Sequence, residues 1–371
     1  MRWWFTMARV LKLTHWSGST VLDLKLNLGL VNEDVPGISR VLISLWKWSR
    51  GVMELERSGA SISFSNSWDY LTVSVKVPRE STNVLRSLWD ALTKVDLSML
   101  GRAINEASTQ VNLAREDTRS RSMAEALRGL MPNSPYGNHP EALLGVDLSG
   151  VKPEDVRKAL DNLAYYSITV VGGDVEVNGS QATGKWPRPS TINSGEVKVS
   201  LSGKVQYTVA IAYPADSIYG KVYDYMAFNT LLGGMGLISR LYTEVRVKRG
   251  LAYYAYSAYI PLGGTGFIVA MAGTREKYVN QVKEIMMSTV ASMREVSKSD
   301  IELVRGNQIG RLVVRAESPE GVAQMYSIIP LYGLPNDYYD RYVKFLGDLR
   351  PETIAKLTDE LRSSFTAVAG P

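Results

Sequence analysis

Hydrophobic and polar residues alternate along two stretches of the chain, and this alternation predicts two β-hairpins. The stretch 59–77 (GASISFSNSWDYLTVSVKV) indicates two strands with a turn near Asn66. The stretch 250–272 has the same pattern, with its turn at 261–264. No charged residue occurs between 250 and 274, but the proline and glycines of the turn favour a buried hairpin over a membrane span.

Segments with apolar residues at helical spacing follow each hairpin. They are 84–95 and 98–130 in the first half, and 278–296 and 299–332 in the second. Ser299 and Glu302 have the spacing of a capping box, which predicts that the last segment begins there.

One segment occurs twice in the sequence. VKPEDVRKALDNLAYYSITVVG at 151–172 is matched by LRPETIAKLTDELRSSFTAVAG at 349–370. Each copy places Pro-Glu where a helix would begin, and each ends in a short β run closed by glycine. The fold expected is therefore α+β, with two homologous domains that are each a sheet covered by helices and that arose by internal duplication.

The region between the two copies has the composition of a linker. Residues 178–195 are rich in glycine, serine, threonine and proline. A length of 371 residues also exceeds what one hydrophobic core usually serves. The prediction is an N-terminal domain at 1–180, a linker at 181–195 and a C-terminal domain at 196–371.

Composition and charge narrow the function classes. The chain has 42 Lys and Arg against 37 Asp and Glu, a formal charge of +5, and no block of like charges. This mild excess is typical of a solvated surface, so nucleic acid is not an expected partner. The absence of cysteine excludes disulfides, thiolate metal sites and cysteine nucleophiles. The apolar run at the N-terminus is too short for a signal peptide, so a soluble, cytoplasmic protein is expected.

Candidate metal and phosphate ligands are few. The sequence has two histidines, His15 and His139, and neither has a second histidine or a carboxylate in a recognisable zinc-binding motif. Both are expected to be structural or surface residues, and no cofactor is expected in this chain. The glycines of LLGGMG (Gly233, Gly234 and Gly236) follow a segment with helical spacing, which favours a turn between helices over a phosphate-binding loop.

The segment 239–259 (SRLYTEVRVKRGLAYYAYSAY) predicts a short helix that ends at Gly250 and continues as a strand. Its residues alone leave two interpretations open. Cations such as Arg246 in a last helical turn complement the unpaired carbonyls, and Tyr253 suits a strand. Alternatively, Arg246 and Tyr253 act together as a functional pair.

The same segment resembles the second-half signature of the pitrilysin/insulinase-type zinc peptidases, in the branch of the mitochondrial processing peptidases and small prokaryotic homologues. That signature places an arginine seven positions before a tyrosine, as R-x-x-x-G-L-A-Y, and here the two are Arg246 and Tyr253. The preceding NTLLGGMGLISRL, the duplication and the closing Pro-Glu helix extend the resemblance over most of the chain.

The zinc motif of that family, H-x-x-E-H, has no counterpart in this sequence. By resemblance it would fall in GISRVLISLW at 37–46, where its functional positions hold Arg40, Ile43 and Ser44. A permanent cation, an alkyl side chain and a hydroxyl cannot replace two imidazole ligands and a general base. The helix itself is expected to remain.

The resemblance implies a non-catalytic subunit of a heteromeric metallopeptidase. In this family two two-domain units enclose a chamber, and the zinc site and the Arg–Tyr pair can lie on separate chains. A homologous partner with an intact H-x-x-E-H motif would hold the zinc, while Arg246 and Tyr253 would contact the substrate and the oxyanion formed during hydrolysis. The substrates would be unfolded peptides. The alternative is a structural scaffold, like the core subunits of respiratory complexes that share this architecture.

Overall fold

The computed structural model describes residues 4–6, 10–13 and 18–371, so His15 lies outside the described residues. The chain forms two compact units, each assembled from three segments. Unit 1 comprises Met1–Val111, Gly145–Trp186 and Leu312–Tyr338, and unit 2 comprises Asn112–Leu144, Pro187–Arg311 and Tyr339–Pro371.

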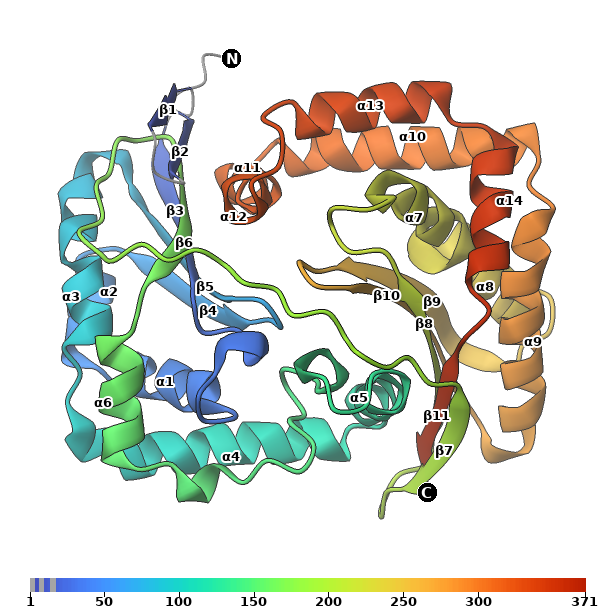
Figure 1. Cartoon of the computed structure of the whole chain (residues 1–371), viewed down its shortest axis with the longest axis horizontal. Coiled ribbons are helices and arrows are strands. Elements are labelled where there is room, and N and C mark those ends of the chain that lie inside the picture. Colours follow the sequence, from blue (N-terminus) through green and yellow to red (C-terminus); the bar gives the residue numbers. More distant parts are fainter. Residues whose placement is uncertain (1–3, 7–9, 14–17) are drawn as a thin grey trace. The chain divides into compact units, whose positions relative to one another are not determined.

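Unit 1 contains a mixed sheet whose strand order, within the described residues, is β1-β2-β6-β3-β5-β4 (Figure 1). Its strands are β1 (Trp4–Thr6), β2 (Val10–Leu13), β3 (Ser19–Leu26), β4 (Ser61–Asn66), β5 (Leu71–Pro78) and β6 (Tyr165–Val171). The β2 and β6 strands pair in parallel, and all other neighbours in this sheet are antiparallel. The β4 and β5 strands are the hairpin predicted at 59–77.

Helices cover both faces of the unit 1 sheet. The α1 helix (Ile38–Lys47) packs on one face through Trp46, whose ring stacks on Phe64 of β4 at a centroid distance of 5.5 Å. The helices α2 (Arg50–Arg57) and α6 (Pro153–Asp161) pack against α1, and α3 (Leu88–Thr93) packs against α2 and α6. On the opposite face, α11 (Pro319–Tyr326) packs Val322 and Ala323 against Val21 and Val171, and the short α12 (Ile328–Tyr332) follows it.

Unit 2 contains a sheet of strand order β7-β11-β8-β10-β9 (Figure 1). Its strands are β7 (Gly195–Ser200), β8 (Tyr207–Ala215), β9 (Ala252–Pro261), β10 (Gly266–Thr274) and β11 (Phe365–Gly370). Its helices are α5 (Thr118–Leu130), α7 (Val222–Asn229), α8 (Arg240–Tyr242), α9 (Val279–Ala291), α13 (Tyr338–Asp348) and α14 (Pro351–Glu360). The uncharged stretch 250–274 forms the predicted β9–β10 hairpin, and none of the described helices is long and apolar enough to cross a bilayer.

The two sheets confirm the predicted α+β duplication. The order β2-β6-β3-β5-β4 in unit 1 matches β7-β11-β8-β10-β9 in unit 2, and the first pair is parallel in both. The repeated Pro-Glu segments begin α6 and α14, with proline at the start of each helix, and lead into β6 and β11. From 182 to 194 the chain forms neither helix nor strand.

The compact units are not the consecutive halves 1–180 and 196–371 predicted from the sequence. The segment that carries α5 follows α4 (Leu100–Glu116) but packs on β8 and β11 of unit 2. The segment that carries α11 and α12 follows α10 (Lys298–Arg315) but packs on the unit 1 sheet. Each half of the sequence therefore contributes helices to the unit formed mainly by the other half.

Several predicted helical segments are interrupted. The segment 98–130 is two helices, because the Asp117 carboxylate accepts a 2.8 Å hydrogen bond from the Ser120 amide and begins α5 anew. The predicted capping box at Ser299 and Glu302 is wrong by two residues. Instead, Ser297 and Asp300 bond reciprocally at the start of α10, where each side chain accepts from the other residue's amide.

Candidate functional site

The Arg246–Tyr253 segment is held on unit 2 by a short helical stretch. The α8 helix continues as a π-helical turn, Thr243–Val247. The side chains of Leu241 and Val245 are fully buried and anchor these two segments in the core. At Gly250 the backbone adopts a left-handed conformation with φ of +64°, as predicted, and the chain enters β9. Leu241 and Val245 before the turn, and the buried Leu251 and Ala252 after it, fix the positions of Arg246 and Tyr253.

The other two cations of this turn have local partners. The Glu244 carboxylate accepts 2.6 Å bonds from both Lys248 and Arg249, and these bonds lower its pKa. Arg249 also donates to the Glu244 backbone carbonyl at 2.7 Å, which is the helix-end role considered for the cations of this segment. Arg246 does not share in this ion-pair cluster.

Arg246 and Tyr253 lie together on the exposed side of the turn. The Arg246 guanidinium donates to the backbone carbonyl of Tyr253 and lies 5.2 Å from the centre of the Tyr242 ring. The Tyr253 side chain is 51% exposed, and its hydroxyl accepts a 3.2 Å hydrogen bond from Nε of Arg275. That bond uses a lone pair of the phenol oxygen and leaves the phenol proton able to donate to another group.

Arg275 is a residue that the sequence interpretation missed. It follows β10 directly, next to Thr274, which pairs with Ala252 across the hairpin. Counting back along both strands from the predicted turn at 261–264 brings position 275 close to Tyr253. The register of the predicted hairpin could therefore have identified Arg275. The exposed site thus has two guanidinium groups and one phenol.

The helix that would carry a zinc motif has no ligand set. Arg40 donates to the Gln110 amide oxygen at 3.4 Å, Ile43 is 5% exposed, and Ser44 is fully buried with its hydroxyl unpaired among the described residues. Glu33 begins this helix by accepting from the Gly37 amide at 2.6 Å, and burial raises its pKa. No group of three His, Cys, Asp or Glu side chains suited to a metal ion occurs in the part of the chain that the structure describes. These residues do not fit zinc.

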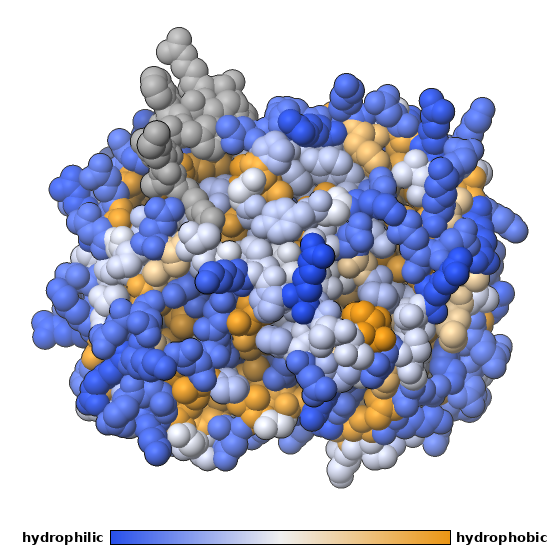
Figure 2. Space-filling view, viewed as in Figure 1, coloured by the Kyte–Doolittle hydropathy of each residue, from blue (hydrophilic) through white to orange (hydrophobic). Residues whose placement is uncertain are grey.

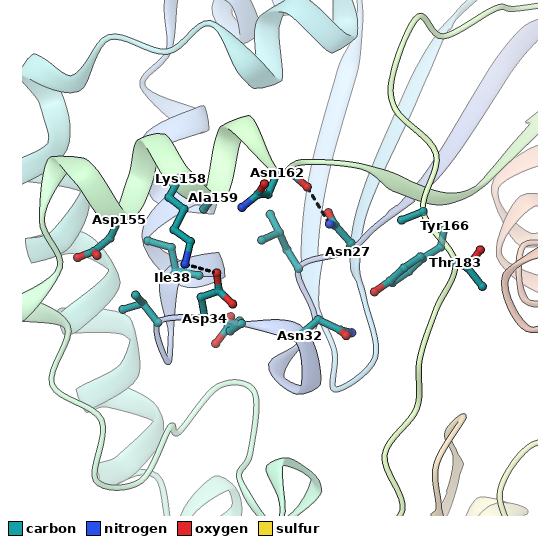
Figure 3. A pocket seen from close by; sticks show the side chains of 14 residues that line it. Asn27, Asn32, Asp34, Ile38, Asp155, Lys158, Ala159, Asn162, Tyr166 and Thr183 are labelled. Atoms are coloured by element: carbon teal, nitrogen blue, oxygen red, sulfur yellow. Dashed lines mark hydrogen bonds and ion pairs between the residues drawn. The ribbon is translucent and has the colours of Figure 1, made fainter.

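A polar cavity of 290 Å³ lies beside this helix (Figure 3). Lys158 of α6 reaches Asp34 of the preceding loop at 2.8 Å, and Asn27 donates to the Asn162 carbonyl at 2.9 Å. Two pairs of its lining residues thus bond to each other, whereas Asn32 and Asp155 bond to the Asp69 carbonyl and the Lys152 amide outside the lining. None of the three positions Arg40, Ile43 and Ser44 lines it.

The remaining candidates have structural roles. His139 is buried, and its Nδ1 accepts from the amides of Glu141 and Ala142 at 3.3 and 3.4 Å within a turn. Gly233 lies where helix and sheet meet closely, since a Cβ there would be 2.1 Å from the Ser257 amide. Its segment, Thr230–Gly234, continues α7 as a π-helical turn and leads through Met235 into a short 3-10 helix at Gly236–Ile238, so the glycines lie within helical backbone where a tight turn between helices was predicted.

A comparison with known protein families shows which family part of this chain is similar to. Residues 149–307, which include Arg246, Tyr253 and Arg275, match the peptidase M16 inactive domain. This match covers less than half of the chain. The M16 match begins beyond α1, so it does not include Arg40, Ile43 or Ser44.

Two individual relatives are also similar to this chain. The chain is 22% identical over 322 residues to the uncharacterized zinc protease YmxG of Bacillus subtilis, covering 77% of this chain and 76% of that protein. It is 39% identical over 84 residues, 23% of this chain and 18% of the other, to an uncharacterized zinc protease of Streptomyces coelicolor.

The fold matches an M16 inactive domain structure from Pseudomonas fluorescens with a TM-score of 0.85 at 17% identity, covering 100% of this chain and 98% of that one. A protease from Helicobacter pylori matches with a TM-score of 0.83 at 17% identity, covering 98% and 96%. The resemblance to the pitrilysin/insulinase-type peptidases, with a non-catalytic character, is thereby confirmed.

Proposed function

We propose that this chain is the zinc-free subunit of a heterodimeric metallopeptidase and presents Arg246 and Tyr253 to a peptide held at the zinc site of its partner. The observation that carries the proposal is the contrast between two sites in one chain. Arg246 and Tyr253 are exposed and held in place, whereas Arg40, Ile43 and Ser44 cannot bind a metal. A cytoplasmic location remains part of the proposal.

The chemistry of the exposed site suits peptide hydrolysis. Negative charge develops on the carbonyl oxygen during attack, and the Tyr253 hydroxyl is a neutral donor that can bond to it. The Arg275 bond to the same hydroxyl brings a positive charge close to that oxygen. Arg246 retains further N–H donors that can hold a substrate carbonyl. The partner's zinc would supply Lewis-acid chemistry, and removing one oxyanion donor typically costs about 3 kcal/mol of barrier.

The proposed substrate is an unfolded peptide in an extended conformation. Within the described residues, β9 is the outermost strand of the unit 2 sheet next to β10, and Tyr253 lies near its start. An outer strand has backbone groups that an extended peptide can pair with. A peptide added there would pass close to Tyr253.

The test is co-expression with a homologous chain that has an intact H-x-x-E-H motif, followed by assays of zinc content and cleavage of flexible peptides. Arg246→Ala and Tyr253→Phe should each reduce kcat of the assembled enzyme about 100-fold. Arg275→Gln should have a smaller effect, because it acts through Tyr253. Arg249→Ala is the matched control and should leave turnover unchanged.

Two results would refute this function. One is a purified lone chain that binds stoichiometric zinc and cleaves peptides. The other is an assembled enzyme whose turnover is the same with Arg246→Ala and Tyr253→Phe as with Arg249→Ala.

A structural scaffold is the second candidate. A chain of complex III2 from Candida albicans has the same fold, with a TM-score of 0.77 at 10% identity, covering 97% of this chain and 93% of that one. A scaffold would purify with a large assembly and would tolerate loss of the Arg246 and Tyr253 side chains. The exposed, hydrogen-bonded pair favours the peptidase subunit.

A further inference from the structure

The two exchanged helices, α5 and α11, begin in the same way but carry opposite charges in their first turn. Asp117 caps α5 and Ser318 caps α11, and each side chain accepts a hydrogen bond from the amide three residues further on. The second residue after each cap is therefore the equivalent position. It holds Arg119 in α5 and Glu320 in α11.

Unit 1 neutralises the charge at this position. Lys76 of β5 lies 2.5 Å from the Glu320 carboxylate, so the sheet supplies the opposite charge. A carboxylate in the first turn also suits the partial positive charge of a helix N-terminus. Glu320 therefore helps to hold α11 on its sheet, and no ligand is needed to explain it.

The sheet of unit 2 supplies no such charge, because the position that corresponds to Lys76 holds Gly273 of β10. The correspondence follows from the pairing registers. In each sheet this residue lies opposite the strand residue, Val21 or Thr208, that pairs with the matching position of the repeated segment. Arg119 therefore has no counterpart of the ion pair that holds α11.

Tyr254 of β9 lies over Gly273 instead. A Cβ at Gly273 would be 2.3 Å from the Tyr254 ring, so only glycine leaves room for the ring in this position. The Tyr254 hydroxyl lies 2.9 Å from the Thr208 hydroxyl of β8. The ring thus reaches inward across β10, away from the outer edge of β9, where the proposed peptide would pair.

Arg119 is exposed and lies on this ring. Its guanidinium is 4.4 Å from the centre of the Tyr254 ring, and it forms no ion pair within the described residues. The neighbouring Asp117 carboxylate accepts from the Ser120 amide and hydroxyl at 2.8 and 2.9 Å. Hydrophilic residues cover much of the molecular face shown in Figure 2, so exposure alone would not distinguish Arg119. The lack of a counter-charge at a position that unit 1 neutralises does distinguish it.

We propose that Arg119 and Tyr254 form a subsite for a carboxylate of the extended peptide that pairs with β9, so that the chain prefers acidic peptides. Every second side chain of such a peptide lies on the same sheet face as Tyr254, next to the guanidinium. A guanidinium has five N–H donors, so contact with the ring leaves two parallel donors for a carboxylate. The inference rests on the peptide pairing with β9 proposed above, and not on the catalytic roles of Arg246 and Tyr253.

Fluorescence anisotropy with the full-length chain alone tests the subsite. The probes are a labelled, flexible, C-terminally amidated decapeptide with a central glutamate, the same peptide with glutamine, and the glutamine peptide with a free C-terminus. The glutamate peptide should bind about ten-fold more tightly than the amidated glutamine peptide. A gain with the glutamate peptide identifies a side-chain carboxylate, and a gain with the free C-terminus alone identifies a terminal one. Equal affinity for the three peptides, or no saturable binding, would overturn the proposal.

Two variants locate the preference. Arg119→Gln should lower the affinity for the carboxylate-bearing peptide to that of the amidated glutamine peptide, and Tm should not change because no ion pair is lost. Arg128→Gln is the matched control, since Arg128 is another exposed arginine of α5, and it should keep the preference. A preference that survives Arg119→Gln, or that Arg128→Gln also removes, would refute the subsite.

A negative result here differs from a failure of the proposed function. The binding assay uses neither zinc nor turnover, whereas the roles of Arg246 and Tyr253 are measured from turnover of the assembled enzyme. An Arg119→Gln variant with an unchanged preference and a lowered Tm would show that Arg119 serves only to hold α5 on the sheet.

Discussion

The sheets of units 1 and 2 have the same strand order but opposite chemistry on the face that the exchanged helix covers. In unit 1 the central positions of this face hold Asp23 and Lys25. In unit 2 the positions with the same register to the last strand hold Ala210 and Ala212. The neighbouring β5 residues Ser74 and Thr72 likewise correspond to Met271 and Val269 of β10.

The contrast shows that this architecture does not require a polar sheet face. In unit 2 the α5 helix covers the corresponding sheet face, and its Gly129 allows the Phe365 ring to approach the helix backbone. Unit 1 leaves a cavity of 270 Å³ beside the buried ion pair of Asp23 and Lys25. Because an alanine pair occupies these positions in unit 2, the shared strand order does not by itself require the Asp23–Lys25 pair of unit 1.

Removing one charge from unit 1 gives the largest effect expected on stability. Lys25→Met should lower the free energy of unfolding by about 3–5 kcal/mol, since Asp23 is then buried without a counter-charge. The double variant Asp23→Ala/Lys25→Met, which makes this face resemble unit 2, should recover most of that loss. Urea denaturation followed by tryptophan fluorescence measures both. A double variant less stable than Lys25→Met would show that the polar face is required for folding.

Filling the closest contact of unit 2 should have an intermediate effect. A Cβ at Gly129 would lie 2.2 Å from the Phe365 ring, so Gly129→Ala should cost about 1–3 kcal/mol. Gly101→Ala in α4 is the matched control, because its Cβ would meet nothing within 4 Å. Thermal unfolding should separate the two variants clearly, and equal Tm values would mean that α5 is not held tightly against β11. Phe365→Leu combined with Gly129→Ala should restore part of the loss.

The smallest effect is a pH dependence confined to the start of α1. Burial raises the pKa of Glu33 above its unfolded value of about 4.3, so the folded state holds this proton more tightly. The stability that Glu33 contributes is therefore present below the unfolded pKa and is lost as pH rises through the folded pKa. Glu33→Gln should gain stability relative to the wild type as the pH rises above the unfolded pKa of about 4.3, as measured by urea denaturation. A difference that changes in the opposite direction would contradict the sign of the shift.

The sequence was sufficient for the two hairpins and the duplication, but not for where the long helical segments are interrupted. Alternation identified both hairpins, and the repeated Pro-Glu helix and glycine-ended strand identified the matching ends of the two domains. Local periodicity reports which face of a helix is apolar, but it does not say which sheet that face covers. The exchange of α5 and α11 was missed for this reason.

The candidate sites were predictable to different degrees. Arg246 and Tyr253 stand in a recognisable motif, and their short separation in sequence brings them together. The position of Arg275 beside Tyr253 depends on the register of the β9–β10 hairpin, which is defined by the three-dimensional pairing of its strands. Asp23 and Lys25 show the alternation of an exposed strand face, and only the packing of α11 reveals that they are buried.

The exchange of helices also constrains how the chain can fold during synthesis. The segment that closes unit 1, Leu312–Tyr338, leaves the ribosome after all the described strands of unit 1. Until then the strands of unit 1 can pair, but the face bearing Asp23 and Lys25 stays open to water, where charged and hydroxyl side chains are well solvated. Before that segment is available, a nascent chain with this polar face exposes less apolar, aggregation-prone surface than one with the alanines of unit 2.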